Sequence, residues 1–214
     1  MLKRLIKGYS KKNEEEQLFQ EFLEQKPVFS QFVEYLKLGT HLPALHIVKQ
    51  NNIRKLQKEY GLTTFVETGT FMGDMVEAQR TCFNKIYSVE LSKDLYHQAV
   101  ERFAEFPHIK IIQGDSGVIL KDLLKEINEP ALFWLDGHYS AGITAKGDKN
   151  TPIEEELSAI LNQKHDHIIL IDDARLFIGE GDYPTIDEIS SFVLGQDARR
   201  MVCVADDIIR VLVK

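Results

Sequence analysis

Length and composition place this 214-residue chain among globular proteins, because 43% of its residues are hydrophobic and 28% are charged. Its formal net charge of -7 argues against a general affinity for nucleic acid, since a phosphate backbone requires a basic surface. No apolar stretch approaches the ~18 residues that span a bilayer, and the N-terminus lacks the apolar core of a signal peptide. We therefore expect a cytoplasmic protein that binds neither nucleic acid nor a membrane.

Residues 1–62 are predicted to form a helical segment. Apolar side chains recur at helical spacing from Leu18 to Leu23 and again from Phe29 to Leu36, and Gly39 ends the second stripe. Another helix is expected from Pro43 to Tyr60. These helices could cap an active site or form a homodimer contact, and packing against a core explains the stripes equally well.

From Thr63 onward, short apolar runs alternate with helical stretches, which is typical of an α/β sheet. The runs are almost continuously hydrophobic and therefore predict parallel strands that are covered on both faces. Two helix starts read as capping boxes: Thr151 to Glu154, with proline at the first helical position, and Thr185 to Glu188. The five predicted parallel strands are 64–66, 85–89, 109–112, 131–135 and 167–171.

The end of the chain breaks this alternation. Two apolar runs, 201–205 and 208–213, are separated only by Asp206 and Asp207. A two-residue connection permits an antiparallel hairpin and forbids a parallel crossover. Residues 63–214 are therefore predicted to form a Rossmann-like, doubly wound sheet of seven strands that ends in an antiparallel hairpin.

A glycine-containing loop follows the first predicted strand, in the sequence Glu67-Thr-Gly-Thr-Phe-Met-Gly73. Ligands bind an α/β sheet at this carboxyl edge, where Gly69 would allow a tight turn and Gly73 a close helix start. The spacing differs from the G-x-G-x-x-G pyrophosphate fingerprint, and the carboxylate of Glu67 suits a cationic group better than a pyrophosphate. A plain strand-to-helix turn is the alternative.

Acidic residues also end the second and third predicted strands. Glu90 lies where a carboxylate accepts hydrogen bonds from both hydroxyls of a ribose. Asp115, with Ser116 beside it, lies where an adenine amino group would be met. The alternatives are a solvated strand end for Glu90 and a helix N-cap for Ser116.

With these motifs, the chain from about Thr63 to its end resembles the class I S-adenosylmethionine-dependent methyltransferases. E-T-G-T-F-M-G resembles their first motif, Glu90 the ribose acid and G-D-S the adenine loop, and five parallel strands with a terminal hairpin are their plan. Thr70 stands where a glycine is usual, although its backbone N–H remains able to meet the cofactor. The resemblance implies S-adenosylmethionine as cofactor, bound by Glu67, Gly69, Thr70, Gly73, Glu90, Asp115, Ser116 and Asp136.

Three aspartates follow the fourth and fifth predicted strands: Asp136, Asp172 and Asp173. The two strands are expected to be neighbours, so these carboxylates should converge and repel one another unless a cation or a proton lies between them. An oxygen-rich site suits Mg²⁺, with Mn²⁺ or Ca²⁺ as alternatives. Asp172 as a helix cap and Asp136 as a turn residue are the alternatives without a metal ion.

This pattern resembles the metal-dependent macrocin O-methyltransferase group. The resemblance implies Asp136, Asp172 and Asp173 as Mg²⁺ ligands, a catalytic role for Asp136, and a small hydroxylated acceptor such as a sugar or secondary metabolite. It places the catalytic base at His138, where the group has an acidic residue. A neutral imidazole is a competent base near pH 7; a metal contact, a substrate contact and a satisfied polar group are the other roles open to His138.

Three rival functions remain open. An NAD-dependent oxidoreductase shares the ribose acid, but the glycine spacing and the terminal hairpin count against it. A metal-dependent hydroxylase or hydrolase would keep the fold and the aspartates. A non-catalytic nucleoside-binding module would keep only cofactor binding.

Overall fold

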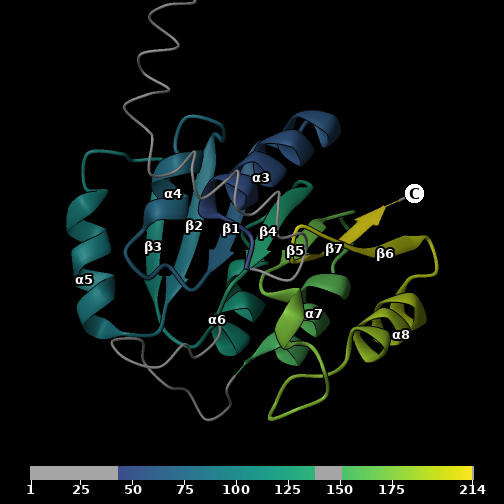
Figure 1. Ribbon diagram of the computed structural model, residues 1–214. Helices are drawn as coiled ribbons and strands as arrows, with labels where there is room; N and C mark the ends of the chain where they lie inside the picture. Colours follow the sequence, from purple (N-terminus) through teal and green to yellow (C-terminus); the bar gives the residue numbers. More distant parts are fainter. Residues whose placement is uncertain (1–42, 138–150, 214) are drawn as a thin grey trace, which may run out of the picture. The chain divides into compact units, whose positions relative to one another are not determined.

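A computed structural model describes residues 43–137 and 151–213 of the chain. Its centre is a seven-stranded sheet in the order β3-β2-β1-β4-β5-β7-β6, shown in Figure 1. The first five strands pair in parallel, and β7 is antiparallel to both β5 and β6, which confirms the predicted fold class. The strands are β1 (Thr64–Thr68), β2 (Lys85–Glu90), β3 (Ile109–Gln113), β4 (Ala131–Leu135), β5 (Ile168–Ile171), β6 (Arg200–Ala205) and β7 (Ile208–Val213).

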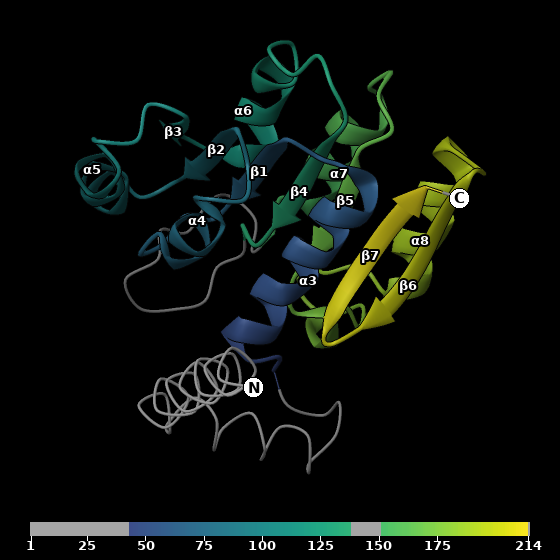
Figure 2. The ribbon, with the colours of Figure 1, turned by 90° about the horizontal axis from the view of Figure 1, so that it is seen from above.

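Helices cover both faces of this sheet, as the continuous hydrophobicity of its strands predicts. Figure 2 shows α3 and α4 on one side of the central strands and α6 and α7 on the other. The helices are α3 (His46–Tyr60), α4 (Asp74–Gln79), α5 (Lys93–Arg102), α6 (Ser116–Leu123), α7 (Ile153–Leu161), the short 3-10 helix η1 (Ala174–Leu176) and α8 (Ile186–Gln196). None of these helices is long and apolar enough to cross a bilayer.

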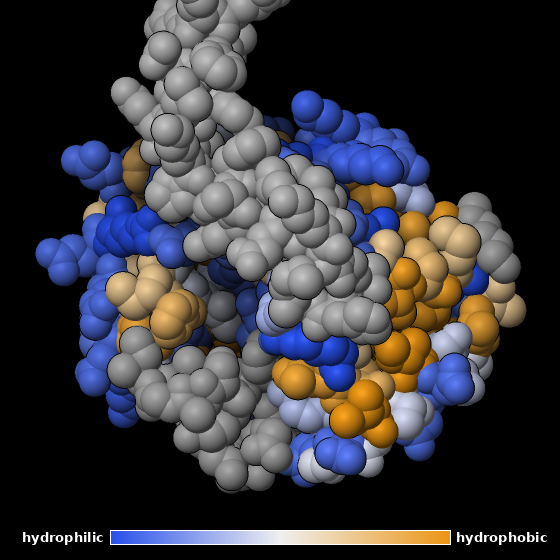
Figure 3. Space-filling model, viewed as in Figure 1, coloured by the Kyte–Doolittle hydropathy of each residue, from blue (hydrophilic) through white to orange (hydrophobic). Residues whose placement is uncertain are grey.

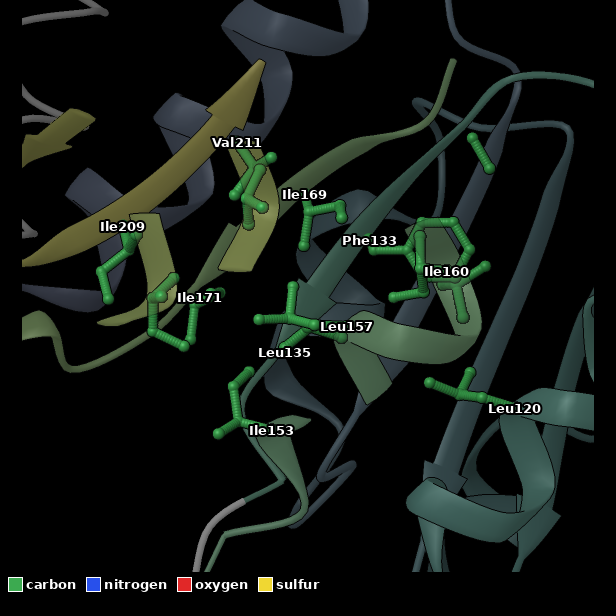
Figure 4. Close-up of a cluster of buried hydrophobic side chains, with 14 of the residues drawn as sticks. Leu120, Phe133, Leu135, Ile153, Leu157, Ile160, Ile169, Ile171, Ile209 and Val211 are labelled. Atoms are coloured by element: carbon green, nitrogen blue, oxygen red, sulfur yellow. The ribbon is translucent and has the colours of Figure 1, made fainter. Parts of the chain in front are cut away.

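Successive strand residues feed two separate hydrophobic cores. In β4, Phe133 and Leu135 join the core beneath α6, α7 and α8, whereas Leu132 and Trp134 join the core beneath α3, α4 and α5. Figure 4 shows the first core, in which Leu157 of α7 packs toward the sheet. The two cores fix the strand ends at which the predicted site residues lie.

The unit that contains the sheet begins at His46. The helix expected from Pro43 to Tyr60 begins at His46 and ends at Tyr60. Residues 1–42 lie outside the described residues, so a cap or a homodimer contact formed by that segment stays a prediction.

The terminal hairpin turns in the predicted two residues. Asp206 and Asp207 both have positive φ angles, 54° and 61°, which is the signature of a type I′ turn. Asp206 Oδ2 also accepts hydrogen bonds from Arg210 Nη2 (2.8 Å) and from Asn52 Nδ2 of α3 (3.2 Å). The hairpin therefore helps to hold α3 on the sheet.

Only one of the two predicted capping boxes forms. Thr185 and Glu188 make both reciprocal contacts at the start of α8. At α7, the N-cap is Pro152, which makes no side-chain cap hydrogen bond, so the box predicted from Thr151 is wrong. The helix starts one residue later than expected, and Thr151 is buried.

The edge strand β6 keeps apolar side chains at the surface. Figure 3 shows apolar groups (orange) gathered over the C-terminal part of the chain. The exposed large hydrophobic residues of this part are Ile178, Phe192, Leu194, Met201 and Val204.

Candidate functional site

The glycine loop after β1 lies directly against the end of β4. Thr68 pairs with Leu135, and the backbone N–H of Asp136 donates to the Thr68 carbonyl oxygen at 3.1 Å. A Cβ atom on Gly69 would lie 2.3 Å from the Asp136 carbonyl oxygen, and Gly69 has a φ angle of 84°. Both the close approach and the positive φ angle therefore require glycine at this position.

Gly73 was predicted to let the helix start close to a ligand, but in the structure it lies against the ring of Phe103. It is the N-cap of α4 with a φ angle of 81°, and an added Cβ atom would lie 2.8 Å from the ring of Phe103. In the described residues, Gly73 thus serves the packing of the loop against the end of α5. Its contact with a cofactor stays a prediction.

Thr70 ties the loop to β2. Its backbone N–H was predicted to meet the cofactor. In the structure it donates to the Val89 carbonyl oxygen at 3.3 Å. Its hydroxyl lies 2.6 Å from the hydroxyl of Ser88. The missing glycine of the motif is therefore replaced by a buried threonine that holds the loop in place.

Glu67 is buried within the sheet. The Ser88 hydroxyl donates to Glu67 Oε2 at 2.5 Å. Burial raises the pKa of Glu67 well above its ordinary value, and the negative charges of Asp136 and Glu90 add to that effect. A cationic ligand would oppose this shift, which is compatible with the predicted contact to a positively charged amino group.

Glu90 ends β2 and organises the loops on either side of it. Its Oε2 accepts from the backbone N–H of Phe71, and its Oε1 from that of Ser92, both at 2.8 Å. Each carboxylate oxygen has lone-pair capacity for a second hydrogen bond, and the ribose contact of Glu90 stays a prediction.

Phe71 is a feature that the sequence did not reveal. Its φ angle is 48°, and the residue is 45% exposed. A bulky residue with a positive φ angle persists only where its surroundings fix it, and the hydrogen bond to Glu90 does so here. The strain and exposure mark the Phe71 ring as a candidate contact for a ligand at this edge.

The helix α6 is capped by Asp115 and not by Ser116, the residue that the sequence offered as its N-cap. Asp115 is the N-cap of α6, because its Oδ1 accepts from the backbone N–H of Gly117 at 2.9 Å. Ser116 is the first helical residue, so an N-cap at Ser116 is wrong. Asp115 is exposed at the carboxyl end of β3, and its adenine contact stays a prediction.

A buried carboxyl group of α7 faces the same edge. A Cβ atom on Gly137 would lie 3.1 Å from Thr68 Oγ1, 3.2 Å from Glu156 Oε1 and 3.3 Å from Ser116 Oγ. Glu156 Oε1 and Thr68 Oγ1 are both buried, and contacts of the Glu156 carboxyl group with Ser116 and Thr68 oppose the effect of burial on its pKa. Burial raises the pKa of Glu156 to about 7. Glu156 shares the buried face of α7 with Ile153 and Ile160, and this helical spacing is the sequence signal that could have identified it.

The aspartates of β5 carry an ion pair with α3. Lys49 Nζ lies 2.5 Å from Asp172 Oδ2 and 3.3 Å from Asp173 Oδ1. Burial raises the pKa of Asp172 to about 8, with the charge of Asp136 as the next cause. Burial alone would lower the pKa of Lys49, but the attraction of Asp172 raises it. Asp173 also accepts from Arg175 Nη1 at 2.7 Å.

The predicted metal ligands are brought together only in part. The backbone N–H of Asp172 donates to the Leu135 carbonyl oxygen at 3.0 Å, so Asp136 and Asp172 follow paired strand ends. Within residues 43–137 and 151–213, however, no group of three or more His, Cys, Asp or Glu side chains is arranged to hold a metal ion. The facing oxygens of Asp172 and Asp173 contact the Lys49 ammonium instead. As placed, these side chains do not fit a divalent ion. The predicted base, His138, lies outside the described residues.

A pocket opens between the ends of β4 and β5. Tyr183 and Phe177 both line it, with perpendicular rings at a centroid distance of 5.3 Å. Burial raises the pKa of Tyr183 to about 12, and the charge of Asp173 adds to the effect, so its hydroxyl remains a hydrogen-bond donor. The pocket is lined by Leu135, Gly137, Thr151, Ile153, Glu156, Ile171, Asp172, Phe177 and Tyr183.

Comparisons with known proteins give a fold and no family. No protein-family model and no curated protein matches the chain.

Solved structures of similar fold include the O-methyltransferase TomG from Streptomyces achromogenes in complex with S-adenosylmethionine. Its TM-score is 0.56 at 16% identity, and the match covers 80% of this chain and 82% of that one. An O-methyltransferase from Bacillus cereus in complex with SAH has a TM-score of 0.55 at 14% identity, over 88% and 90% of the two chains. A putative caffeoyl-CoA O-methyltransferase from Staphylococcus aureus has a TM-score of 0.54 at 13% identity, over 92% and 98%. The chain thus has the Rossmann-like fold of class I S-adenosylmethionine-dependent methyltransferases.

Proposed function

We propose that this chain is an S-adenosylmethionine-dependent O-methyltransferase that acts on a small hydroxylated acceptor, such as a sugar or secondary metabolite. The observation that carries the proposal is the loop between β1 and α4. Gly69 is pressed against the Asp136 backbone while Glu90 holds the Phe71 N–H, at the carboxyl edge where this fold binds ligands.

The proposed cofactor would lie along the carboxyl ends of β1, β2 and β3. Glu90 would accept hydrogen bonds from the ribose hydroxyls, and Asp115 with Ser116 would meet the adenine. Glu67 would balance the cationic amino acid end. S-adenosylmethionine supplies an electrophilic methyl group, so the main tasks of the protein are to align an acceptor oxygen and to remove its proton.

The acceptor would bind at the mouth of the small pocket at the ends of β4 and β5. Tyr183 and Glu156 offer hydrogen-bonding groups there, and Leu135, Ile153 and Ile171 offer apolar walls. His138 stays the proposed base and Asp136 the proposed catalytic partner, as the resemblance implies. Magnesium assistance through Asp136, Asp172 and Asp173 stays a prediction, and the Lys49 ammonium opposes it because it contacts two of the three side chains.

Calorimetric titration tests the proposal directly. We expect S-adenosylhomocysteine to bind with a micromolar Kd, with or without Mg²⁺, and NADH not to bind. Binding of NADH alone would instead identify an oxidoreductase. Binding of S-adenosylhomocysteine without turnover on any hydroxylated acceptor would indicate a nucleoside-binding module. Failure of both ligands to bind would leave a metal-dependent hydroxylase or hydrolase.

The variant Gly69→Ala locates the binding site. A Cβ atom at this position collides with the Asp136 backbone, so S-adenosylhomocysteine should bind at least about tenfold more weakly. Gly195→Ala is the matched control, because an added Cβ atom there meets nothing within 4 Å. Equal affinity of Gly69→Ala and wild type would place the cofactor elsewhere.

A further inference from the structure

Lys49 stands out from the other lysines because it is enclosed between carboxylates. Its side chain is 13% exposed, and the Asp172 side chain that it contacts is 2% exposed. The other lysine ion pairs of the described residues lie at the surface. In the pair of Lys110 with Glu126, for example, each side chain is 55% exposed. A contact of the Lys49 kind needs a structural or functional reason, since a charge is removed from water to make it.

The fold holds α3 so that Lys49 reaches this position. Ile53 and Leu56 of α3 are buried in the core beneath the helix. One helical turn after Lys49, Asn52 accepts a hydrogen bond from Arg210 Nη2 of β7 at 2.6 Å. The helix is therefore anchored at several points, and the Lys49 contact follows from that anchoring.

Lys49 also competes for the oxygens that a metal ion would need. Asp173 Oδ1 receives both Lys49 Nζ at 3.3 Å and Arg175 Nη1 at 2.7 Å. A divalent ion bound to the same oxygens would lie close to two positive groups and be repelled by them. The positive charge that the converging aspartates require is already supplied by the chain.

We propose that Lys49 is the resident cation of this site, so that its ammonium, held by Asp172 and Asp173, takes the place of a divalent metal ion at the carboxyl ends of β4 and β5. An ammonium has three N–H donors, and its aspartate contacts use two of them. In the proposed reaction the third would meet an acceptor oxygen in the pocket that Asp172 also lines. That last role rests on the proposed methyltransferase function, whereas the replacement of the metal ion does not.

Electron paramagnetic resonance with Mn²⁺ tests the replacement. The wild-type protein should bind no Mn²⁺ at this site. Lys49→Ala removes the ammonium and leaves the carboxylates, so it should acquire Mn²⁺ binding, at least about tenfold tighter than any residual, nonspecific binding to the wild type. Lys55→Ala is the matched control on the same helix, because Lys55 is exposed, and it should behave as wild type. The double variant Lys49→Ala/Asp172→Asn should lose the acquired binding.

Two results would overturn the proposal. One is tight Mn²⁺ binding by the wild type that Asp172→Asn abolishes, since a metal ion would then displace Lys49. The other is a folded Lys49→Ala protein, checked by circular dichroism, that gains no Mn²⁺ binding. Lys49→Met retains an apolar stem and repeats the test should the alanine variant unfold. S-adenosylhomocysteine binding is measured on the same samples, so failure of the methyltransferase proposal is seen separately.

Discussion

Glu156 shows how one residue couples the candidate site to the stability of the fold. Its carboxyl group is buried beside Gly137, and its pKa is raised from 4.5 to about 7. The folded state therefore favours the protonated acid. The free energy of unfolding should fall as pH rises from the unfolded pKa to the folded one, by up to about 3 kcal/mol from this group.

Replacing Glu156 with glutamine should remove that pH dependence. Relative to wild type, Glu156→Gln should become more stable as pH rises between roughly 4.5 and 7, because the amide carries no charge to bury. Urea denaturation at several pH values measures the difference. Glu101→Gln, at an exposed position of α5, serves as the control. An unchanged difference between Glu156→Gln and wild type across this range would mean that Glu156 is not held in a buried, uncharged form.

Residues at strand ends were predictable, and residues that reach the site from helices were not. Gly69 and Glu90 lie where the alternation of strands and helices places them, at one edge of a parallel sheet. Glu156 is hidden in a run of three glutamates, and only the buried stripe of α7 separates it from its neighbours. Lys49 is separated from Asp172 by 123 positions, so no local pattern connects the two residues.

Among the elements, β5 is braced to its neighbours by the buried residue that precedes it. The backbone N–H of Ala131 donates to His167 Nδ1 at 3.1 Å, and Arg200 Nη1 donates to the His167 carbonyl oxygen. Burial lowers the pKa of His167 to about 4, and the nearby His165 and Arg200 add to this effect. A neutral imidazole therefore joins the start of β4 to β5, and the backbone of the same residue joins β5 to β6.

This brace should make the sheet sensitive to acid. Because the folded pKa of His167 is below the ordinary value of 6.5, its contribution is complete above pH 6.5. That contribution to the free energy of unfolding is lost as pH falls through 6.5 toward about 4, by up to about 3 kcal/mol.

The variant His167→Asn keeps an acceptor for the Ala131 N–H but does not titrate, so its stability relative to wild type should improve on acidification. Thermal unfolding at several pH values measures this, with exposed His97→Asn as control. If His97→Asn changed the profile as much as His167→Asn, the brace would not be the cause.

The limits of the elements were predicted closely where apolar runs define them. The fourth strand and the last strand match their predicted bounds, whereas β1 extends past Val66 to Thr68. The extension was missed because Glu67 and Thr68 are polar residues that the fold buries. The start of α7 was misplaced for a related reason, since Thr151 is buried and does not cap the helix.

At the scale of the whole molecule, the type of sheet follows from the sequence, but the packing of α3 does not. The two-residue connection at Asp206 forces a terminal hairpin, and the alternation before it forces parallel strands. The attachment of α3 depends on contacts of Asn52 with Arg210 and Asp206, which lie more than 150 positions away. Such contacts become visible only after the chain has folded.

Cofactor binding should stabilise the whole molecule, because a ligand that binds only the folded state shifts the unfolding equilibrium. At about 100 times its Kd, S-adenosylhomocysteine should add about 2.7 kcal/mol, which corresponds to a rise in Tm of roughly 5–10 °C. Glu90→Gln removes the charge that would accept the ribose hydroxyls, and a tenfold loss of affinity would reduce the gain at the same ligand concentration to about half. The variant also loses one of the two backbone contacts of Glu90, so its Tm without ligand should fall as well.

The quantity to compare is therefore the rise in Tm that the ligand causes, and not the Tm of each variant without ligand. Differential scanning fluorimetry with Glu101→Gln as control measures it, and an undiminished rise in Glu90→Gln would remove Glu90 from the cofactor site while leaving its role in holding Phe71 and Ser92 intact.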